Sequence, residues 1–385
     1  MRSTRADQRP RLRAKLGCSF AVLVGFLGAI EIALRVAGYD PFGRMFSAAP
    51  EASREGLELG LMRVVDGEDI LVYDLNPGAR GYAWQADIQV NAHGFRDRDF
   101  RPKEPGTLRI LALGDSATFG VKLPREVLWP AEIERALRKE GRKVEVFNLG
   151  IVGYDVLEEV ALLEKHVEGL SPDKVVVAYH PNDIGHVSAT RTYIHRLQSY
   201  GSAWYRIRLL QYLRSRLDMS ELNREFHMVN TDSYFLERNA GYIADLGDDP
   251  TTRRLVSELQ ARTADREDVK KLKHRYLEWY MNLDRLGKLR YSLERLKELA
   301  EARDFDVALF VVPWLGDQGL EGAYDQLYEI VKYETERSGF TYIPMADATR
   351  ALGHGKLLIE KRDFGHPNST GHRVMAERLA NALQW

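Results

Sequence analysis

The chain has 385 residues, of which 44% are hydrophobic, 29% charged and 10% aromatic. This composition supports a sizeable hydrophobic core and excludes fibrous and disordered proteins. The 55 Lys and Arg residues nearly balance the 56 Asp and Glu residues, which argues against a general binder of nucleic acid. Cys18 is the only cysteine, which excludes a disulfide framework and a cysteine-rich metal site within one chain.

The N-terminal segment has the pattern of a membrane signal. Residues 1–15 form a basic tail, and the apolar run that follows continues past Glu31. The strictly uncharged part is shorter than the roughly 20 residues of a full span, but Glu31 lies near its end, where a charge can reach the interface. We predict a signal anchor or transmembrane helix over 16–38, with the N-terminus cytoplasmic and the body periplasmic or extracellular. A cleaved, secreted form is the alternative.

Residues 39–105 have an irregular pattern that predicts a linker and a small β-rich extension. Short β-like pieces occur at 69–73 and 86–90, and turn signals occur at 76–78 and 91–94. The segment that contains Arg96 is expected to form a turn packed against the body. A position of Arg96 near the cleft is the alternative.

From residue 106 the chain alternates between buried strands and amphipathic helices. Five short apolar runs are typical of parallel strands: 108–113, 144–149, 174–179, 305–312 and the weaker 340–344. Helical patterns lie between them, around 126–140, 156–167 and 289–300. The alternation predicts an α/β fold with a parallel five-stranded sheet covered on both faces, whose ligands bind beyond the carboxyl ends of the strands.

A helical insertion is expected at about 186–285, within a domain that spans 106–385, because this interval is too long for one crossover. It contains aromatic and basic residues from Trp204 to Arg216. They fit a surface that contacts sugar rings or anionic lipid headgroups. They also fit an amphipathic cap helix that buries Ile207, Leu210 and Leu217.

Four motifs stand where strands end or before the last helix. Ser116 closes a Gly-Asp-Ser tripeptide after the first strand, and a glycine-rich turn that ends at Gly153 follows the second. Asn182 follows the third strand, and Asp363 and His366 precede the last helical pattern, for which Ser369 is the expected N-cap. Each motif alone has an ordinary explanation, such as a chance tripeptide, a tight turn or a helix cap.

The order of the four motifs carries a resemblance to a known family. Over about 108–381, without the insertion, the chain resembles the SGNH (GDSL-type) hydrolase superfamily, and in particular its membrane-anchored bacterial members. The family's blocks are a GDS serine, an N-x-G-x-x-G glycine, a G-x-N-D asparagine and a late D-x-x-H pair. The resemblance implies a flavodoxin-like α/β/α sandwich and ester or acyl-transfer chemistry. One position departs from the pattern, because His180 replaces the glycine of the third block.

These residues supply what acyl transfer requires. Ser116 is the expected nucleophile, His366 the base and later the acid, and Asp363 the group that orients the imidazole. The backbone N–H groups of Ser116 and Gly153 and the side-chain amide of Asn182 are expected to form the oxyanion hole. Gly153 is preferred over Gly150 because it matches the family's second glycine.

No metal or other cofactor is expected. His186, His354 and His372 lack an H-E-x-x-H run or a clustered Cys/His spacing, and no phosphate-binding P-loop sequence occurs. His372 is expected to be structural or solvent-facing. Asp115 and Asp183 are expected to fix loop hydrogen bonds rather than to act as acids.

Three functions fit the sequence. The first is a serine esterase that cleaves an acyl ester, for example an acetyl ester, on a cell-envelope glycan or lipid. The second is an O-acyltransferase that uses the same triad on an envelope polysaccharide. The third is a non-catalytic envelope-assembly protein. No motif indicates the natural substrate or the oligomeric state.

Overall fold

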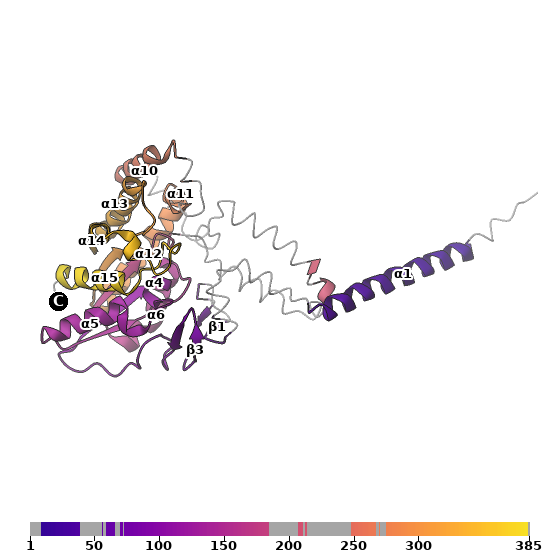
Figure 1. Cartoon of the computed structure of the whole chain (residues 1–385), viewed down its shortest axis with the longest axis horizontal. Coiled ribbons are helices and arrows are strands. Elements are labelled where there is room, and N and C mark those ends of the chain that lie inside the picture. The colour runs from indigo at the N-terminus through magenta and orange to yellow at the C-terminus, as the bar shows by residue number, and fades with distance from the viewer. Residues whose placement is uncertain are drawn as a thin grey trace, which may run out of the picture. The chain divides into compact units, whose positions relative to one another are not determined.

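A computed structural model describes residues 9–38, 56, 59–65, 70–71, 73–184, 207–210, 212–213, 248–266, 269 and 275–383 (Figure 1). The chain forms two compact units. The first combines Met1–Ala49 with His195–Val229, and the second combines Pro50–Ile194 with Asn230–Trp385. Part of the predicted insertion therefore groups with the N-terminal helix.

The first unit contains helix α1 (Arg9–Val36), which starts within the predicted basic tail. Its Gly17–Val36 portion has 20 residues and a mean hydropathy of 2.0, enough to span a membrane or to act as a signal sequence. The Glu31 carboxylate accepts hydrogen bonds from the backbone N–H groups of Arg208 (3.0 Å) and Leu209 (2.7 Å). A segment of the predicted insertion is thus held to the apolar helix.

The predicted burial of Ile207 and Leu210 is wrong, since their side chains are 41% and 37% exposed. The residues that would complete a cap helix there, Leu217 among them, lie outside the described part of the chain, as do Trp204 and Arg216.

The second unit begins with two small antiparallel pairs. Strand β1 (Met62–Val64) pairs with β2 (Tyr73–Leu75), and β3 (Arg80–Ala83) forms a hairpin with β4 (Ala86–Gln89). β2 overlaps the strand expected at 69–73 at Tyr73, and residues 69 and 72 lie outside the described part of the chain. The β3–β4 turn consists of Trp84 and Gln85, both in the left-handed region with φ of 51° and 56°, a conformation that matches the twist of a tight hairpin.

The body is built on a parallel sheet of five strands, in the order β6-β5-β7-β8-β9. The strands are β5 (Leu108–Gly114), β6 (Val144–Asn148), β7 (Lys174–Tyr179), β8 (Asp306–Val311) and β9 (Thr341–Ile343). This is the flavodoxin-like strand order. All five predicted strands are confirmed, because a strand buried on both faces reads as a continuous apolar run.

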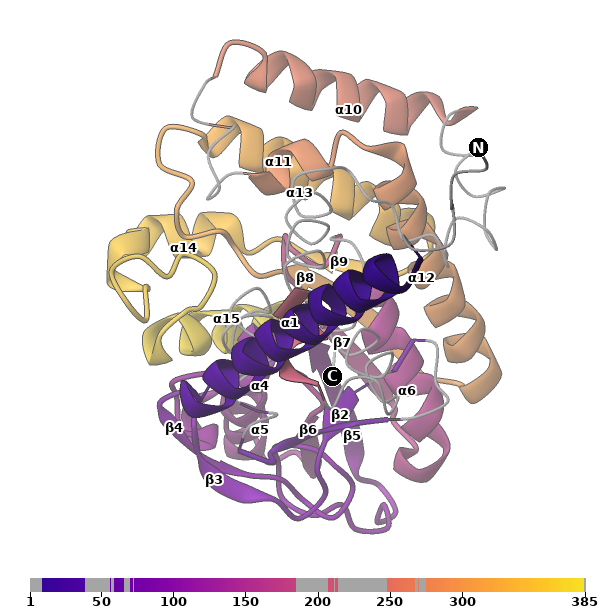
Figure 2. The same ribbon diagram turned by 90° about the vertical axis from the view of Figure 1, so that its right-hand side faces the viewer.

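Helices cover both faces of the sheet (Figure 2). On one face, α5 (Trp129–Lys139) and α15 (Ser369–Ala382) pack side chains such as Ile133 and Leu379 against Ile110 and Phe310. On the other side lie α6 (Val156–Leu170), α12 (Leu283–Arg303) and α13 (Glu321–Arg337). The predicted α/β/α sandwich is therefore confirmed.

Several short elements complete the described body. They are α4 (Ser116–Phe119), the 3-10 turns Arg125–Val127 and His354–Lys356, α10 (Pro250–Thr263), α11 (Arg275–Trp279) and α14 (Ala346–Leu352). Helices α10 and α11 belong to the predicted insertion. Asp249, the N-cap of α10, shares the buried Arg290 guanidinium of α12 with Glu334 of α13, and these ion pairs fix α10 to the sandwich.

Two expectations about the last helix need correction. The N-cap of α15 is Asn368, not Ser369, because the Asn368 side-chain oxygen accepts from the N–H groups of Thr370 and Gly371. His372 is only 1% exposed, and its Nδ1 atom accepts the Trp129 N–H at 3.2 Å. It is therefore structural, and the solvent-facing alternative is wrong.

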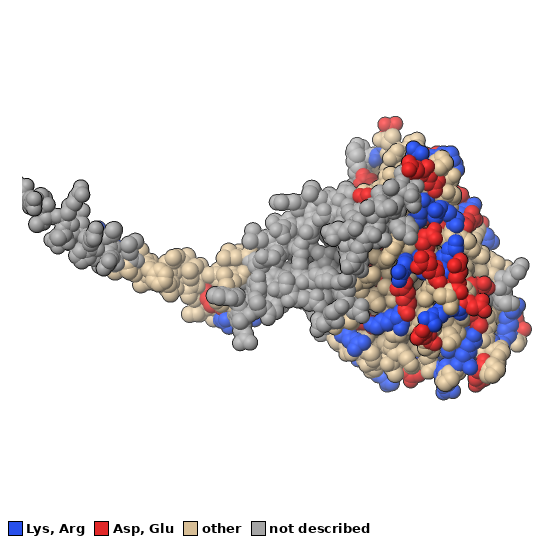
Figure 3. All heavy atoms as spheres, turned by 180° about the vertical axis from the view of Figure 1, so that it is seen from behind, with Lys and Arg blue, Asp and Glu red and all other residues tan. Residues whose placement is uncertain are grey.

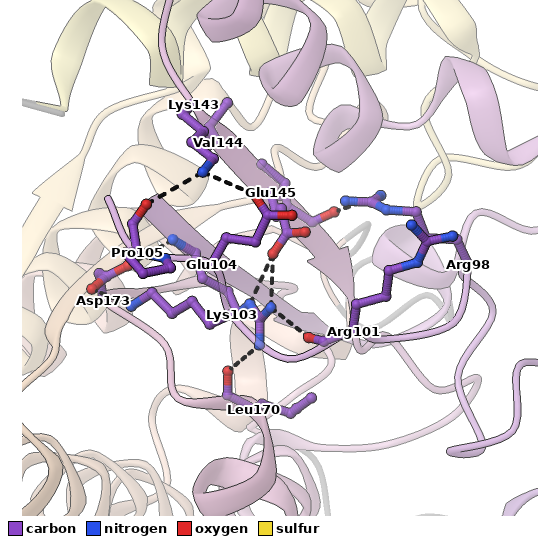
Figure 4. Close-up of polar contacts among 12 residues, drawn as sticks. Arg98, Arg101, Lys103, Glu104, Pro105, Lys143, Val144, Glu145, Leu170 and Asp173 are labelled. Atoms are coloured by element: carbon purple, nitrogen blue, oxygen red, sulfur yellow. Dashed lines mark hydrogen bonds and ion pairs between the residues drawn. The ribbon is translucent and has the colours of Figure 1, made fainter. Parts of the chain in front are cut away.

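The amino ends of the strands are held by a network of charges (Figure 4). The buried Arg109 guanidinium of β5 donates to Glu145 of β6 and to the carbonyl oxygens of Arg101 and Leu170. Lys103 pairs with Asp173 at 2.5 Å. These contacts attach the segment before β5 to the edge of the sheet opposite the strand ends that carry the motifs.

Candidate active site

The first strand of the sheet leads directly into a short helix that starts at Ser116. Gly114 ends β5 with a φ of +152°, and a Cβ there would lie 2.2 Å from the Thr118 hydroxyl oxygen, so only glycine fits this turn. Asp115 is the N-cap of α4 and accepts the Ala117 N–H at 2.8 Å. The sequence pattern predicted the next helix only some ten residues later, and α4 was missed because four residues show no periodicity.

Ser116 and His366, which are 250 positions apart, lie within hydrogen-bond distance. The Ser116 Oγ atom is 2.8 Å from His366 Nε2. On the other side of the ring, His366 Nδ1 is 2.7 Å from Asp363 Oδ1. A hydroxyl, an imidazole and a carboxylate thus follow one another in the order that nucleophilic catalysis by serine requires.

Lys122 holds the second oxygen of Asp363, a contact that the sequence did not predict. Its Nζ atom is 2.9 Å from Asp363 Oδ2 and 3.0 Å from Glu360. Burial alone would raise the pKa of Asp363, but the hydrogen bond from His366 and the pair with Lys122 outweigh it and hold that pKa well below its ordinary value. Asp363 is therefore ionised wherever the imidazole is needed as a base.

The expected donors of an oxyanion hole have different surroundings. The Gly150 N–H is taken by the Asn148 side-chain oxygen at 2.9 Å. Gly153 has a φ of +81°, and its N–H has no hydrogen-bond partner among the residues that the structure describes. The Asn182 Nδ2 atom donates to Asp115 Oδ2 at 3.3 Å, which leaves its second N–H for another acceptor. These features favour Gly153 over Gly150 as a donor.

Comparison with known proteins identifies the family. Residues 112–374 match the model of the GDSL-like lipase/acylhydrolase family, which is more than half of the chain. The chain belongs to the GDSL-like lipase/acylhydrolase family. This confirms the resemblance to the SGNH/GDSL superfamily, whose enzymes are hydrolases that act on ester bonds.

The individual proteins that the chain resembles share little of its sequence. The chain is 33% identical over 75 residues to an arylesterase of Vibrio mimicus, and this match covers 20% of the chain but only 38% of the relative. Among solved structures, a variant of Axe2, an acetyl xylan esterase from Geobacillus stearothermophilus, is 15% identical with a TM-score of 0.39, covering 72% of this chain and 94% of that one. The esterase EstA from Pseudoalteromonas sp. is 11% identical with a TM-score of 0.36, covering 71% and 95%.

The segment before β5 supports the backbone that follows the GDSL serine. Arg96 is 2% exposed, and its guanidinium donates to the backbone carbonyl oxygens of Phe119, Gly120 and Leu123. This matches the expected packed turn, and Arg96 also lies at the wall of the groove between the β3–β4 hairpin and the segment 122–126. The neighbouring Asp97 accepts the Asn148 N–H at 2.7 Å, so the same turn also braces the strand that leads to the second motif.

The other histidines and aspartates named from the sequence have structural partners. His354 pairs with Asp317 at 2.9 Å, and Asp183 accepts the His180 N–H. His186 lies outside the described residues. Within the described ranges, no group of three or more His, Cys, Asp or Glu residues is arranged to hold a metal ion.

A groove has Lys122 in its lining, but none of Ser116, Asp363 and His366. It has a volume of about 950 Å³ and lies between the β3–β4 hairpin and the segment 122–126, with Tyr82, Gln85, Arg98, Lys122 and Arg125 among its lining residues. Tyr82 is 66% exposed. Lys122 connects the groove to the triad, since it lines one and pairs with the other.

Replacing Lys122 tests its role beside the triad. A lowered pKa of Asp363 means that its stabilising contribution is present above the ordinary value of 3.8 and is lost as the pH falls below it. We expect Lys122→Met to lower turnover about fivefold at pH 7 and the free energy of unfolding by about 1 kcal/mol. That stability difference persists at pH 4 and disappears only as the pH falls well below 3.8, through the lowered pKa of Asp363. Urea unfolding at several pH values measures it.

Lys361→Met, at an exposed position on the loop that carries Asp363, is the control and should change neither quantity. An unchanged free energy of unfolding for Lys122→Met at pH 7 would contradict a charge interaction with Asp363.

Proposed function

We propose that this protein is a serine esterase that cleaves an acyl ester through Ser116, His366 and Asp363. The observation that carries the proposal is the chain of contacts of 2.8 Å and 2.7 Å from the hydroxyl through the imidazole to the carboxylate. His366 Nε2 takes the proton of Ser116 as the oxygen attacks the ester carbonyl, and Asp363 stabilises the imidazolium.

The same residues complete the cycle. The negative oxygen of the tetrahedral intermediate accepts hydrogen bonds from the N–H groups of Ser116 and Gly153 and from the Asn182 amide. His366 then gives its proton to the leaving alkoxide. Water, activated by His366, attacks the acyl-enzyme and releases the acid. If a sugar hydroxyl takes the place of water, the same steps make the protein an O-acyltransferase.

We further propose that the ester lies on a glycan of the cell envelope. The groove supports this, because an exposed tyrosine ring packs well against the C–H face of a sugar, while amide and guanidinium groups bind its hydroxyls.

The apolar helix α1 supports a position at the membrane. Its basic N-terminal flank favours a cytoplasmic N-terminus and a body on the outer side. The backbone N–H groups from the insertion satisfy the Glu31 carboxylate near the end of the span, which lowers the cost of a charge at that depth. We propose a single-pass anchored enzyme, not a cleaved secreted one.

The nucleophile can be tested directly. We expect Ser116→Ala to lower hydrolysis of p-nitrophenyl acetate by at least about 10³-fold, because the residual rate comes from the oxyanion hole alone. A serine-directed phosphonate should label Ser116, and mass spectrometry of the peptides locates the adduct. Ser369→Ala, in the first turn of α15 near His366, is the control and should keep full activity. Wild-type protein that neither hydrolyses the ester nor reacts with the phosphonate would favour the non-catalytic assembly protein.

The groove is tested by substrate preference. We expect Tyr82→Ala to lower the ratio of kcat/KM for an acetylated xylo-oligosaccharide to that for p-nitrophenyl acetate by about tenfold, since one stacking contact is lost. Leu352→Ala removes another exposed apolar side chain and should leave the ratio unchanged. Addition of unacetylated acceptor glycans shows by product analysis whether the acyl group passes to a sugar. An unchanged ratio in Tyr82→Ala would contradict binding in the groove.

The anchor is tested by fractionation. We expect the full chain to stay with membranes through an alkaline carbonate wash and to keep its N-terminal peptide, while protease added to spheroplasts digests the body. A variant without residues 1–38 should be released from the membrane. Recovery of a soluble mature chain that lacks α1 would show that the segment is a cleaved signal peptide.

A further inference from the structure

His180 occupies the position where the family pattern has glycine, directly after β7 (Lys174–Tyr179). Its side chain is buried, with 4% of the residue exposed. The imidazole lies between two segments of the candidate site, the Asn182 loop and the loop that carries His366. This residue is the departure from the family motifs that the sequence shows, and it contacts both the Asn182 loop and the His366 loop.

On one side, His180 contacts the side-chain amide of Asn182. The His180 Nδ1 atom is 2.6 Å from Asn182 Oδ1. On the far side of the same amide, Asn182 Nδ2 donates to Asp115 Oδ2 at 3.3 Å. A carboxylate only accepts hydrogen bonds, so the amide nitrogen must face Asp115 and the amide oxygen must face His180.

This arrangement determines where the His180 proton lies. An amide oxygen only accepts, so the 2.6 Å contact requires a proton on His180 Nδ1. The backbone N–H of Asn182 is much farther from the same atom, at 3.4 Å. Burial lowers the pKa of His180, although Asp115, Asn182 and the Gly365 backbone favour the charged ring. In the neutral ring, the contact with the Asn182 oxygen places the single proton on Nδ1.

On the other side, the ring faces the catalytic loop. A Cβ atom on Gly365, the residue before His366, would lie 3.1 Å from His180 Nε2, so this backbone packs closely against the imidazole. The rings of Trp314 and Tyr276 lie at 6.1 Å and 6.5 Å from His180, both edge to face. These neighbours hold the ring in place.

We propose that His180 is a positioning residue of the oxyanion hole: its Nδ1–H holds the Asn182 amide so that the amide N–H points to the site of the developing oxyanion. The inference rests on the proposed function. Without the Nδ1–H donor the amide can rotate and present its oxygen, which repels an oxyanion. His180 itself touches neither the ester nor Ser116 and transfers no proton.

Two variants with side chains of nearly equal size distinguish the effect of the N–H donor at position 180 from the effect of side-chain packing. An asparagine at 180 keeps an N–H donor near the Nδ1 position, whereas a leucine fills a similar volume without one. We expect His180→Leu to lower kcat for p-nitrophenyl acetate about 10- to 100-fold with KM changed less than about threefold, because the lost interaction acts in the transition state. His180→Asn should restore kcat to within about threefold of the wild type. Equal losses in both variants would overturn the proposal.

A double-mutant cycle with Asn182 provides the second readout. Asn182→Ala alone should cost on the order of 10²-fold in kcat. If His180 acts through Asn182, His180→Leu should cost less than about threefold more in that background. A full additional loss would show that His180 acts by packing alone. If His180→Leu does not fold, the kcat of His180→Asn decides, and a loss of tenfold or more overturns the proposal.

A measurement without substrate separates this inference from the proposed function. In the full chain labelled with 15N-histidine, NMR at neutral pH should show His180 with its proton on Nδ1, assigned by the signal lost in His180→Asn. The proton should shift or exchange between nitrogens in Asn182→Leu. A proton on Nε2 in the wild type would overturn the inference, even if Ser116-dependent hydrolysis is found. Absence of hydrolysis with the expected tautomer would count against the proposed function only.

Discussion

The hydrogen bond between Ser116 and His366 depends on how two loops from distant parts of the chain are held at one edge of the sheet. Ser116 is fixed because β5, a central strand, turns at Gly114 directly into α4. The loop of His366 is fixed by Asn368, which caps α15 and also donates to the carbonyl oxygens of Lys356 and Leu358. A contact of 2.8 Å needs both loops to be rigid, and each is secured by backbone hydrogen bonds rather than by the triad itself.

The β-rich extension belongs to this site rather than to the linker that precedes it. Lys122, with a φ of +64°, donates its N–H to the Trp84 carbonyl oxygen at 2.8 Å, and Trp84 packs edge to face on Phe119 at 4.9 Å. Left-handed residues other than glycine are costly and persist where surrounding contacts demand them. The hairpin turn therefore sets the backbone that aims Lys122 at Asp363. On the face in Figure 3, basic and acidic side chains are mixed over the described body.

The sheet, its flanking helices and the motif residues could be predicted from the sequence because each depends on local pattern. Parallel strands buried on both faces are apolar runs. Ser116 and Asn182 are recognisable at the ends of such runs and His366 before the last helix, in the order of the family's motifs. The support of these residues could not be predicted. Arg96 and Lys122 act through contacts with backbone oxygens and a carboxylate that the fold brings together, and nothing in their neighbouring residues indicates these partners. The cap of α15 differed by one residue, because Ser369 and Asn368 are both good caps and the loop geometry decides between them.

His180 illustrates how a departure from a motif can be compatible with its chemistry. A glycine there would leave the Asn182 amide held only by Asp115, whereas the imidazole contacts the amide from the opposite side. The larger side chain is accommodated because its neighbour across the site, Gly365, has no Cβ, so that the two positions together fill the space. Asp183, whose pKa is raised well above its ordinary value by burial, accepts the His180 backbone N–H and fixes the same turn. The backbone hydrogen bond, the neighbouring rings and the Nδ1 proton together hold the His180 imidazole in one orientation. A fixed imidazole in turn keeps the Asn182 amide rigid, as an oxyanion donor must be.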